Sequence, residues 1–432
     1  MKDYLTGYLA PVPDEIEALD LPVTGALPPE LTGRYFRNGP NPRPGEDPGH
    51  WFTGPGMIHG IRLRSGRAEW YRNRWVRTSE FTDNAPYVSE EGVVDLAANP
   101  ANTNVIRHAG RIYALVEAGL PYEMSPDLET LGARDFGRRL TTAMTAHPKE
   151  DPVTGDLHFF GYGFFAPYLT YHRLSKSGEL VESREIPVPG PTMMHDFAVT
   201  ANHVVWLDLP VVFDLDLAVT GGMPYRWDDG YGARIGVMPK AGGPVRWTEV
   251  DPCYVFHVGN AHEDAQGRVV IDAVRYTAGD FAGLWGRIGG STNPAAETGG
   301  SVLHRWTIDG AAVKEEALDD RHIEFPTIND AHTGLDGRYV YTVGESVVVK
   351  YDTKSGQSWA RQTAGHTGEA VFVPREPDSA GSEDDGWLLS IVSTLDGSDL
   401  VVLDAADLSS VASVRLPRRV PAGFHGHWLA DE

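Results

Sequence analysis

GWLLSIVSTLDGSDLVVLDA, residues 386–405, has the pattern of two β-strands joined by a tight turn. Its two halves are rich in Leu, Ile and Val, and they flank Asp396-Gly397-Ser398, which is a typical hairpin turn sequence. Similar runs of β-branched and aromatic residues recur at 203–213, 268–276 and 338–352. The sequence therefore predicts a fold built mainly from short strands joined by turns.

The strand pattern continues through all 432 residues without a linker, and the 48 glycines and 31 prolines are spread evenly along it. Helical periodicity is limited to 13–20 and 125–139, which are the two best helix candidates. Many short strands in one unbroken array favour a closed radial repeat. We expect residues 1–432 to form a single all-β domain, a β-propeller whose repeats are too divergent to give the number of blades.

Composition excludes several classes of function. The chain carries 60 acidic and 37 basic residues, a formal charge of -23, and such a protein repels nucleic-acid backbones. No apolar run approaches the ~20 residues of a transmembrane helix. The N-terminus lacks the basic and then apolar pattern of a signal peptide, and Cys253 is the single cysteine. We therefore expect a cytoplasmic protein without a transmembrane segment.

Four of the 16 histidines stand at the ends of predicted strands, beside turn residues: His147, His195, His257 and His425. Equivalent strand ends converge in a propeller, so residues far apart in the chain can meet at one metal ion. Gly423 and Gly426 flank His425 and allow the backbone a close approach there. These histidines are either metal ligands or ordinary core residues, and the spacing leaves both interpretations open.

A series of ordered segments gives the chain a family resemblance. They are LTGRYFRNGPNPRP at 31–44, HWFTGPGMIHGIRL at 50–63, NTNVIRHAGRIYALVEAGLP at 102–121, FHVGNAHED at 256–264, HIEFPTIN at 322–329, GEAVFVPR at 368–375 and VPAGFHGHW at 420–428. In these segments the chain resembles the carotenoid cleavage oxygenase family, which includes carotenoid-, apocarotenoid- and stilbene-cleaving dioxygenases and the retinal pigment epithelial membrane protein. The bacterial stilbene-type branch is the most similar. The resemblance implies a seven-bladed β-propeller with a small helical or loop cap over the metal face.

The resemblance also implies the cofactor and its ligands. Fe(II) would be bound by His147, His195, His257 and His425, with O2 as co-substrate. Four neutral imidazoles suit iron and leave two positions of an octahedral ion open. Three glutamates at matching positions would accept hydrogen bonds from ligand histidines: Glu117, Glu324 and Glu369. No side chain beyond this metal shell is assigned a catalytic role.

An apolar or aromatic alkene is the expected small-molecule partner. Residues beside the metal motifs could line its path: Phe52, Val116, Tyr122, Phe164, Phe256 and Phe424. Core packing is the alternative explanation for each. Val116 occupies the position where stilbene-cleaving relatives place a lysine that engages a phenol, which argues against a 4-hydroxystilbene substrate. Thr53 and Pro55 replace two acids of the usual FDGDGMIH signature, and neither position is a ligand.

The predicted function is therefore oxidative cleavage of a C=C bond in an apocarotenoid, stilbenoid or phenylpropanoid alkene, giving two carbonyl products. The alternatives are an iron-dependent alkene isomerase of the same family, a Ca²⁺-binding propeller hydrolase and a non-enzymatic ligand-binding propeller. Residues 279–290 place Phe281, Leu284, Trp285 and Ile288 at near-helical spacing. They would either make weak contact with a membrane surface or pack on the cap. The sequence leaves the oligomeric state open.

Overall fold

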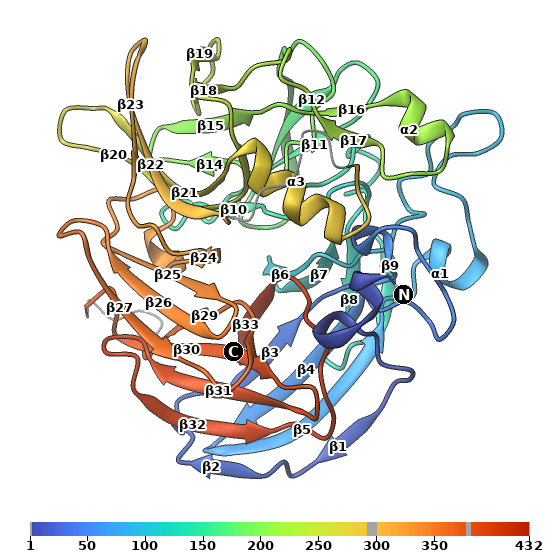
Figure 1. Cartoon of the computed structure of the whole chain (residues 1–432), viewed down its shortest axis with the longest axis vertical. Coiled ribbons are helices and arrows are strands. Elements are labelled where there is room, and N and C mark those ends of the chain that lie inside the picture. Colours follow the sequence, from blue (N-terminus) through green and yellow to red (C-terminus); the bar gives the residue numbers. More distant parts are fainter. Residues whose placement is uncertain (1, 292–299, 377–381, 432) are drawn as a thin grey trace. The chain divides into compact units, whose positions relative to one another are not determined.

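The structure is a computed structural model that describes residues 2–291, 300–376 and 382–431 (Figure 1). The described residues form seven sheets of four to six strands and one two-stranded ribbon. These seven sheets are the blades of a β-propeller, so the predicted fold class is confirmed. Contacts group the residues into two compact units, 1–135 with 341–432 and 136–340. The expectation of a single domain stays a prediction.

Three sheets belong to the first unit. The first has the strand order β1 (Glu17–Leu19), β5 (Arg67–Trp75), β4 (Met57–Arg64), β3 (Gly33–Arg37) and β33 (Gly426–Ala430). The second has the order β2 (Val23–Gly25), β32 (Ser410–Arg415), β31 (Ser398–Asp404), β30 (Gly386–Ser393) and β28 (His366–Thr367), and β29 (Val371–Pro374) also pairs with β30. The third has the order β6 (Asn104–His108), β7 (Arg111–Leu115), β8 (Tyr122–Met124) and β9 (Thr130–Ala133). The predicted hairpin is β30 and β31, which lie side by side in the orange-to-red part of Figure 1.

Three further sheets and the ribbon belong to the second unit. They are β10 (Lys149–Glu150), β11 (Leu157–Tyr162), β12 (Leu169–Leu174) and β13 (Leu180–Glu185); β14 (Ala198–Val199), β15 (His203–Asp208), β18 (Arg234–Pro239) and β19 (Arg246–Glu249); β20 (Tyr254–Glu263), β21 (Val269–Tyr276), β22 (Val302–Asp309) and β23 (Ala312–Ala317); and the ribbon of β16 (Val211–Phe213) and β17 (Tyr225–Trp227). The seventh sheet has the order β24 (Glu324–Thr327), β25 (Tyr339–Gly344), β26 (Val347–Asp352) and β27 (Gln357–Gln362).

The α-helices are short: α1 (Ser79–Asp83), α2 (Leu215–Val219) and α3 (Ala278–Arg287). Neither predicted helix, at 13–20 or at 125–139, forms, so both predictions were wrong. In the first stretch, residues 17–19 form β1, which pairs with β5 at the edge of a sheet. Ile16 and Ala18 pack against the hydrophobic core from this position. In the second, Leu128, Phe136 and Arg138 have positive φ angles, which a right-handed helix cannot contain.

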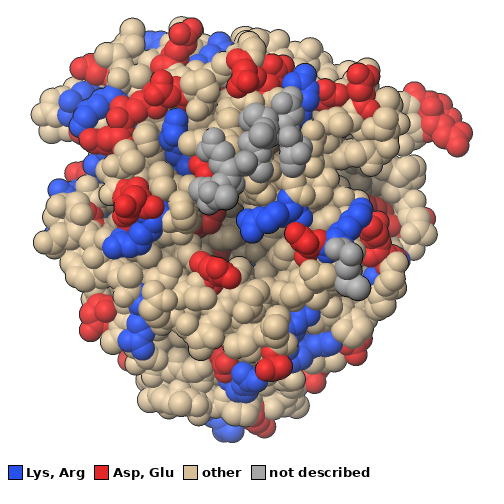
Figure 2. Space-filling view, in the orientation of Figure 1, with Lys and Arg blue, Asp and Glu red and all other residues tan. Residues whose placement is uncertain are grey.

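Three of the four apolar residues singled out in 279–290 face the protein interior, and the fourth, Leu284, is half-buried. Helix α3 begins after Thr277, which forms a capping box with Asp280, and Phe281, Trp285 and Ile288 are all buried. Phe281, Trp285 and Ile288 therefore offer no apolar surface for the membrane contact that we considered. Among the described residues, no helix is long and apolar enough to cross a bilayer. On the face shown in Figure 2, Lys and Arg side chains lie among Asp and Glu and gather into no continuous basic patch.

Candidate metal centre

Three of the predicted ligands meet within the second unit. The Nε2 atoms of His147 and His195 are 3.0 Å apart. The ring centroids of His147 and His257 are 5.1 Å apart, and those of His195 and His257 are 5.2 Å apart. All three residues are buried. Two nitrogens bound at about 2.1 Å to one metal and at a right angle would be about 3.0 Å apart, so the spacing of His147 and His195 suits a shared ion.

A buried carboxylate fixes the orientation of the His257 ring. The Nδ1–H of His257 donates to Glu324 Oε2 at 2.6 Å, while Tyr276 donates its phenol proton to Glu324 Oε1 at 2.8 Å. Burial, and then the charge of Glu324, raise the pKa of Tyr276 well above 10, so the phenol keeps the proton that it donates. With its Nδ1 proton donated to Glu324, His257 has its Nε2 lone pair to offer a metal.

Phe325, which contacts both His257 and Glu324, has a strained backbone conformation. It has a φ of 51° although it carries a bulky side chain and precedes a proline, and both features disfavour that conformation. Its ring stacks on His257 with centroids 5.1 Å apart, and its N–H donates to Glu324 Oε2. Strained residues persist where surrounding contacts hold them, and here those contacts belong to the proposed ligand and its carboxylate.

His425, in the first unit, is paired in the same way. Its Nδ1–H donates to Glu369 Oε1 at 2.8 Å, and Glu369 Oε2 accepts the backbone N–H of Gly426 at 2.7 Å. The His425 backbone is held by two neighbours: Asn38 N donates to His425 O, and His425 N donates to Thr103 O. These contacts fix both the backbone and the ring plane, so Nε2 is the ring atom with which His425 could bind a metal.

Gly423, two residues before His425, has room for no side chain. A Cβ there would lie 1.8 Å from a guanidinium nitrogen of Arg37, which is buried and donates to Pro421 O at 2.6 Å. We expect Gly423→Ala to lower the free energy of unfolding by about 1–3 kcal/mol, since the buried guanidinium must move. Chemical denaturation measures this loss. Gly163→Ala is the matched control, because a Cβ at Gly163 meets nothing within 4 Å. Equal stability of the two variants would contradict the expectation.

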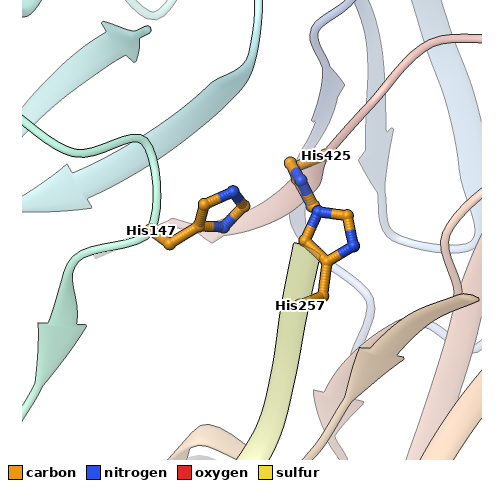
Figure 3. Close-up of side chains that lie close together, drawn as sticks. All are labelled: His147, His257 and His425. Atoms are coloured by element: carbon orange, nitrogen blue, oxygen red, sulfur yellow. The ribbon is translucent and has the colours of Figure 1, made fainter. Parts of the chain in front are cut away.

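Figure 3 draws three buried histidines that could serve as metal ligands, His147 and His257 of the second unit and His425 of the first. Neutral imidazoles are good ligands for iron, and carboxylates on the Nδ1 atoms of His257 and His425 raise their basicity. The donor set therefore fits a divalent iron ion. His195, also of the second unit, lies against His147, and the assignment of all four histidines as ligands stays a prediction.

Comparison with known proteins places the chain in a family. Residues 9–430 match the family described as retinal pigment epithelial membrane protein. A carotenoid cleavage oxygenase from Mycobacterium tuberculosis is 40% identical over 98% of this chain and 97% of its own length. The chain belongs to the carotenoid cleavage oxygenase family. The prediction of an enzyme of this family is confirmed.

Solved structures of carotenoid cleavage oxygenase relatives agree with the fold. A lignostilbene dioxygenase from Pseudomonas brassicacearum superposes with a TM-score of 0.87 and 27% identity, covering 100% of this chain and 99% of that one. A cobalt-substituted Synechocystis apocarotenoid oxygenase gives a TM-score of 0.83 at 27% identity, covering 99% of this chain and 98% of that one. The similar proteins therefore include both carotenoid- and stilbene-type enzymes.

The other residues predicted for the site of this carotenoid cleavage oxygenase homologue are Glu117 and the six that could line the substrate path. Glu117 and Val116 are both buried, and the hydrogen bond of Glu117 to a ligand histidine stays a prediction. In the first unit, Phe52 and Phe424 pack edge to face with centroids 5.4 Å apart, next to His425. Tyr122 donates its hydroxyl to Ala97 O at 2.7 Å, which is a structural contact.

In the second unit, Phe256 packs edge to face against His195, with centroids 5.2 Å apart, and is buried. Phe164 is half-buried and stacks on Phe213. Substrate contact by Phe52, Val116, Tyr122, Phe164, Phe256 and Phe424 stays a prediction.

Other histidines have structural partners. His59 Nδ1 and the Tyr71 hydroxyl are hydrogen-bonded at 2.8 Å, and His158 Nδ1 and the Tyr171 hydroxyl at 2.7 Å.

Sequence reasoning missed residues that contact the predicted ligands or their partners, chiefly Tyr276, Phe325, Lys149 and Asp196. Only Asp196 carried a signal, as an acid directly after His195 in the apolar run MMHDFAV.

Proposed function

We propose that the protein is a non-haem Fe(II)-dependent dioxygenase that cleaves a carbon–carbon double bond of an apocarotenoid, stilbenoid or phenylpropanoid alkene. The observation that carries this proposal is that two buried imidazoles, one in each unit, are oriented by a carboxylate: His257 and His425 donate their Nδ1 protons to Glu324 and Glu369. When bound, Fe(II) would supply the redox chemistry through which O2 reacts with the alkene. His147, His195, His257 and His425 would hold it.

The reaction requires little acid–base chemistry from the chain. One alkene and one O2 give two carbonyl products, and no proton is gained or lost overall. The side chains therefore have to orient the imidazoles, exclude water and select the double bond. Phe256 and Phe424 are buried apolar rings adjacent in sequence to His257 and His425, and they suit a substrate without charged groups.

Val116 bears on the choice among the three alkene classes. It is buried and aliphatic beside Glu117, so it offers no cation or donor to a phenol. The 40% identical Mycobacterium tuberculosis relative is named a carotenoid cleavage oxygenase, which supports an apocarotenoid before a hydroxystilbene. The structural likeness to lignostilbene dioxygenase keeps stilbenoids in the proposal.

We expect iron-dependent cleavage of one member of a small alkene panel. Metal-free protein would be reconstituted anaerobically with Fe(II), and O2 uptake and carbonyl products would be followed with β-apo-8'-carotenal, β-carotene, resveratrol and isoeugenol. One O2 consumed per double bond cleaved, and two carbonyl fragments, are the expected result. Protein reconstituted with Zn(II) is the control, because zinc has no redox chemistry. Isomerised alkene without O2 uptake would favour the isomerase instead.

We also propose that the enzyme acts in the cytoplasm. Cys253 is buried, and burial raises the pKa of its thiol to about 12, so this single cysteine suits a reducing compartment as a neutral core residue. Fractionation of the source cells with an antibody to the protein tests this location.

A further inference from the structure

The carboxylate of Asp196 contacts all three ligand-bearing segments of the second unit. It directly follows His195 in the chain. Its Oδ2 accepts the backbone N–H of Val258 at 2.7 Å, and Val258 directly follows His257. Lys149 Nζ lies 2.9 Å from Asp196 Oδ1, and Lys149 follows His147 by two residues.

This carboxylate is well buried and its hydrogen-bonding capacity is used. The Asp196 side chain is 1% exposed, and its Oδ1 also accepts the N–H of Phe197 at 2.8 Å. A buried charge is tolerated where it is paired and hydrogen-bonded, and Lys149, Phe197 and Val258 supply those partners. The charge therefore depends on the three segments staying where they are.

The contact with Val258 also explains the local shape of β20. The register between β20 and β21 shifts on either side of Val258, so Phe256 and His257 lie in an irregular stretch of the ladder. Such a bulge bends a strand, re-aims a side chain and takes backbone groups out of the regular ladder. Asp196 accepts the Val258 N–H at this point, and so fixes the irregular stretch that presents His257.

We propose that Asp196, paired with Lys149, is a positioning residue that sets the relative placement of the His147, His195 and His257 imidazoles and thereby the metal affinity of the site. The inference rests on the proposed function, since it assigns these histidines to a metal. Asp196 acts through the backbone and Lys149, and it touches neither metal nor substrate. Its removal would leave the ligands present but displaced.

Co(II) binding tests this role without using turnover. Co(II) would be titrated into metal-free wild type, Asp196→Asn, Lys149→Met and Lys149→Arg, with the visible absorption of bound Co(II) reporting the ligand geometry. Asp196→Asn and Lys149→Met are expected to weaken Co(II) binding about tenfold or more and to shift the absorption bands. Lys149→Arg keeps the cation and is expected to lose less.

Asp384→Asn is the matched control, because Asp384 is paired with the buried Lys350 at 2.6 Å and contacts none of the three ligand segments through any described hydrogen bond. It is expected to lower thermal stability while binding Co(II) with the affinity and spectrum of the wild type. A wild-type affinity and spectrum in Asp196→Asn would overturn the proposal, as would an equal loss of binding in Asp384→Asn. If Asp196→Asn does not fold, Lys149→Met decides by the same criteria.

The same titration separates the two proposals. Wild type that binds Co(II) but cleaves no alkene of the panel would contradict the proposed reaction and leave the role of Asp196 to be judged from the variants. Wild type that binds neither Co(II) nor Fe(II) would overturn both, since a positioning residue needs a metal site to act on.

Discussion

Replacing His425 by alanine is expected to abolish turnover and to weaken Fe(II) binding by more than the roughly 10–100-fold that loss of an outer-shell partner costs. The substitution removes an imidazole whose Nδ1 donates to Glu369 at 2.8 Å. It also leaves that carboxylate, 7% exposed, without one of its hydrogen-bond donors. Iron content after reconstitution and O2 uptake with the cleaved alkene are the measurements.

His427→Ala is the control for this experiment. His427 is two residues further on, in β33, where its backbone pairs with Phe36 of β3. We expect it to keep iron content and turnover within about twofold of the wild type, as is usual for a substitution outside such sites. An inactive His427→Ala beside an active His425→Ala would reverse the ligand assignment.

Glu369→Gln is expected to lower metal affinity or turnover by up to about 100-fold, although it changes neither size nor shape. Glu369 accepts two hydrogen bonds, from His425 Nδ1 at 2.8 Å and from Gly426 N at 2.7 Å. The two bonds go to different oxygens of Glu369, and in glutamine one of these oxygens becomes a donor nitrogen, which cannot accept a hydrogen bond. If its nitrogen faces His425, the imidazole proton must move to Nε2, where a metal needs the lone pair. If its nitrogen faces Gly426, two donors meet.

Iron titration of the metal-free variant, with turnover beside it, measures the Glu369→Gln effect. Glu123→Gln is the matched control, because Glu123 is also a buried glutamate but is paired with Arg111 at 2.8 Å instead of a histidine. Its iron affinity should equal that of the wild type. A Glu369→Gln variant with unchanged iron affinity would remove Glu369 from the support of His425.

The strands could be predicted because their signals are local, but His257, expected at a strand end, lies inside β20. The hairpin at 386–405 forms as β30 and β31, and the run at 338–352 forms β25 and β26. The same local reasoning failed at 13–20, where pairing of Glu17 with Arg72 of β5 decides the structure. That partner is distant in sequence, so no window around residue 17 contains it.

The support of the metal site is harder to predict for the same reason. The glutamates Glu324 and Glu369 were found through the family resemblance, and the structure shows each hydrogen-bonded to a histidine that is a predicted ligand. Asp196 stood out locally as an acid after His195, but its partners, Lys149 and Val258, lie in other segments and could not be predicted. Helix α3 shows a second limit: the spacing of Phe281 and Trp285 is the same whether a helix faces a bilayer or a core, and here it faces the core.

The pairing of β3 with β33 has a consequence for biosynthesis. The strand that closes this sheet, Gly426–Ala430, begins directly after His425 and pairs with Gly33–Arg37 from the start of the chain. A ribosome-bound chain that has been translated only to residue 420 therefore lacks both the closing strand and His425. Completion of this sheet and placement of His425, a predicted ligand, are therefore coupled steps of folding, and both wait until the segment 425–430 has been synthesised.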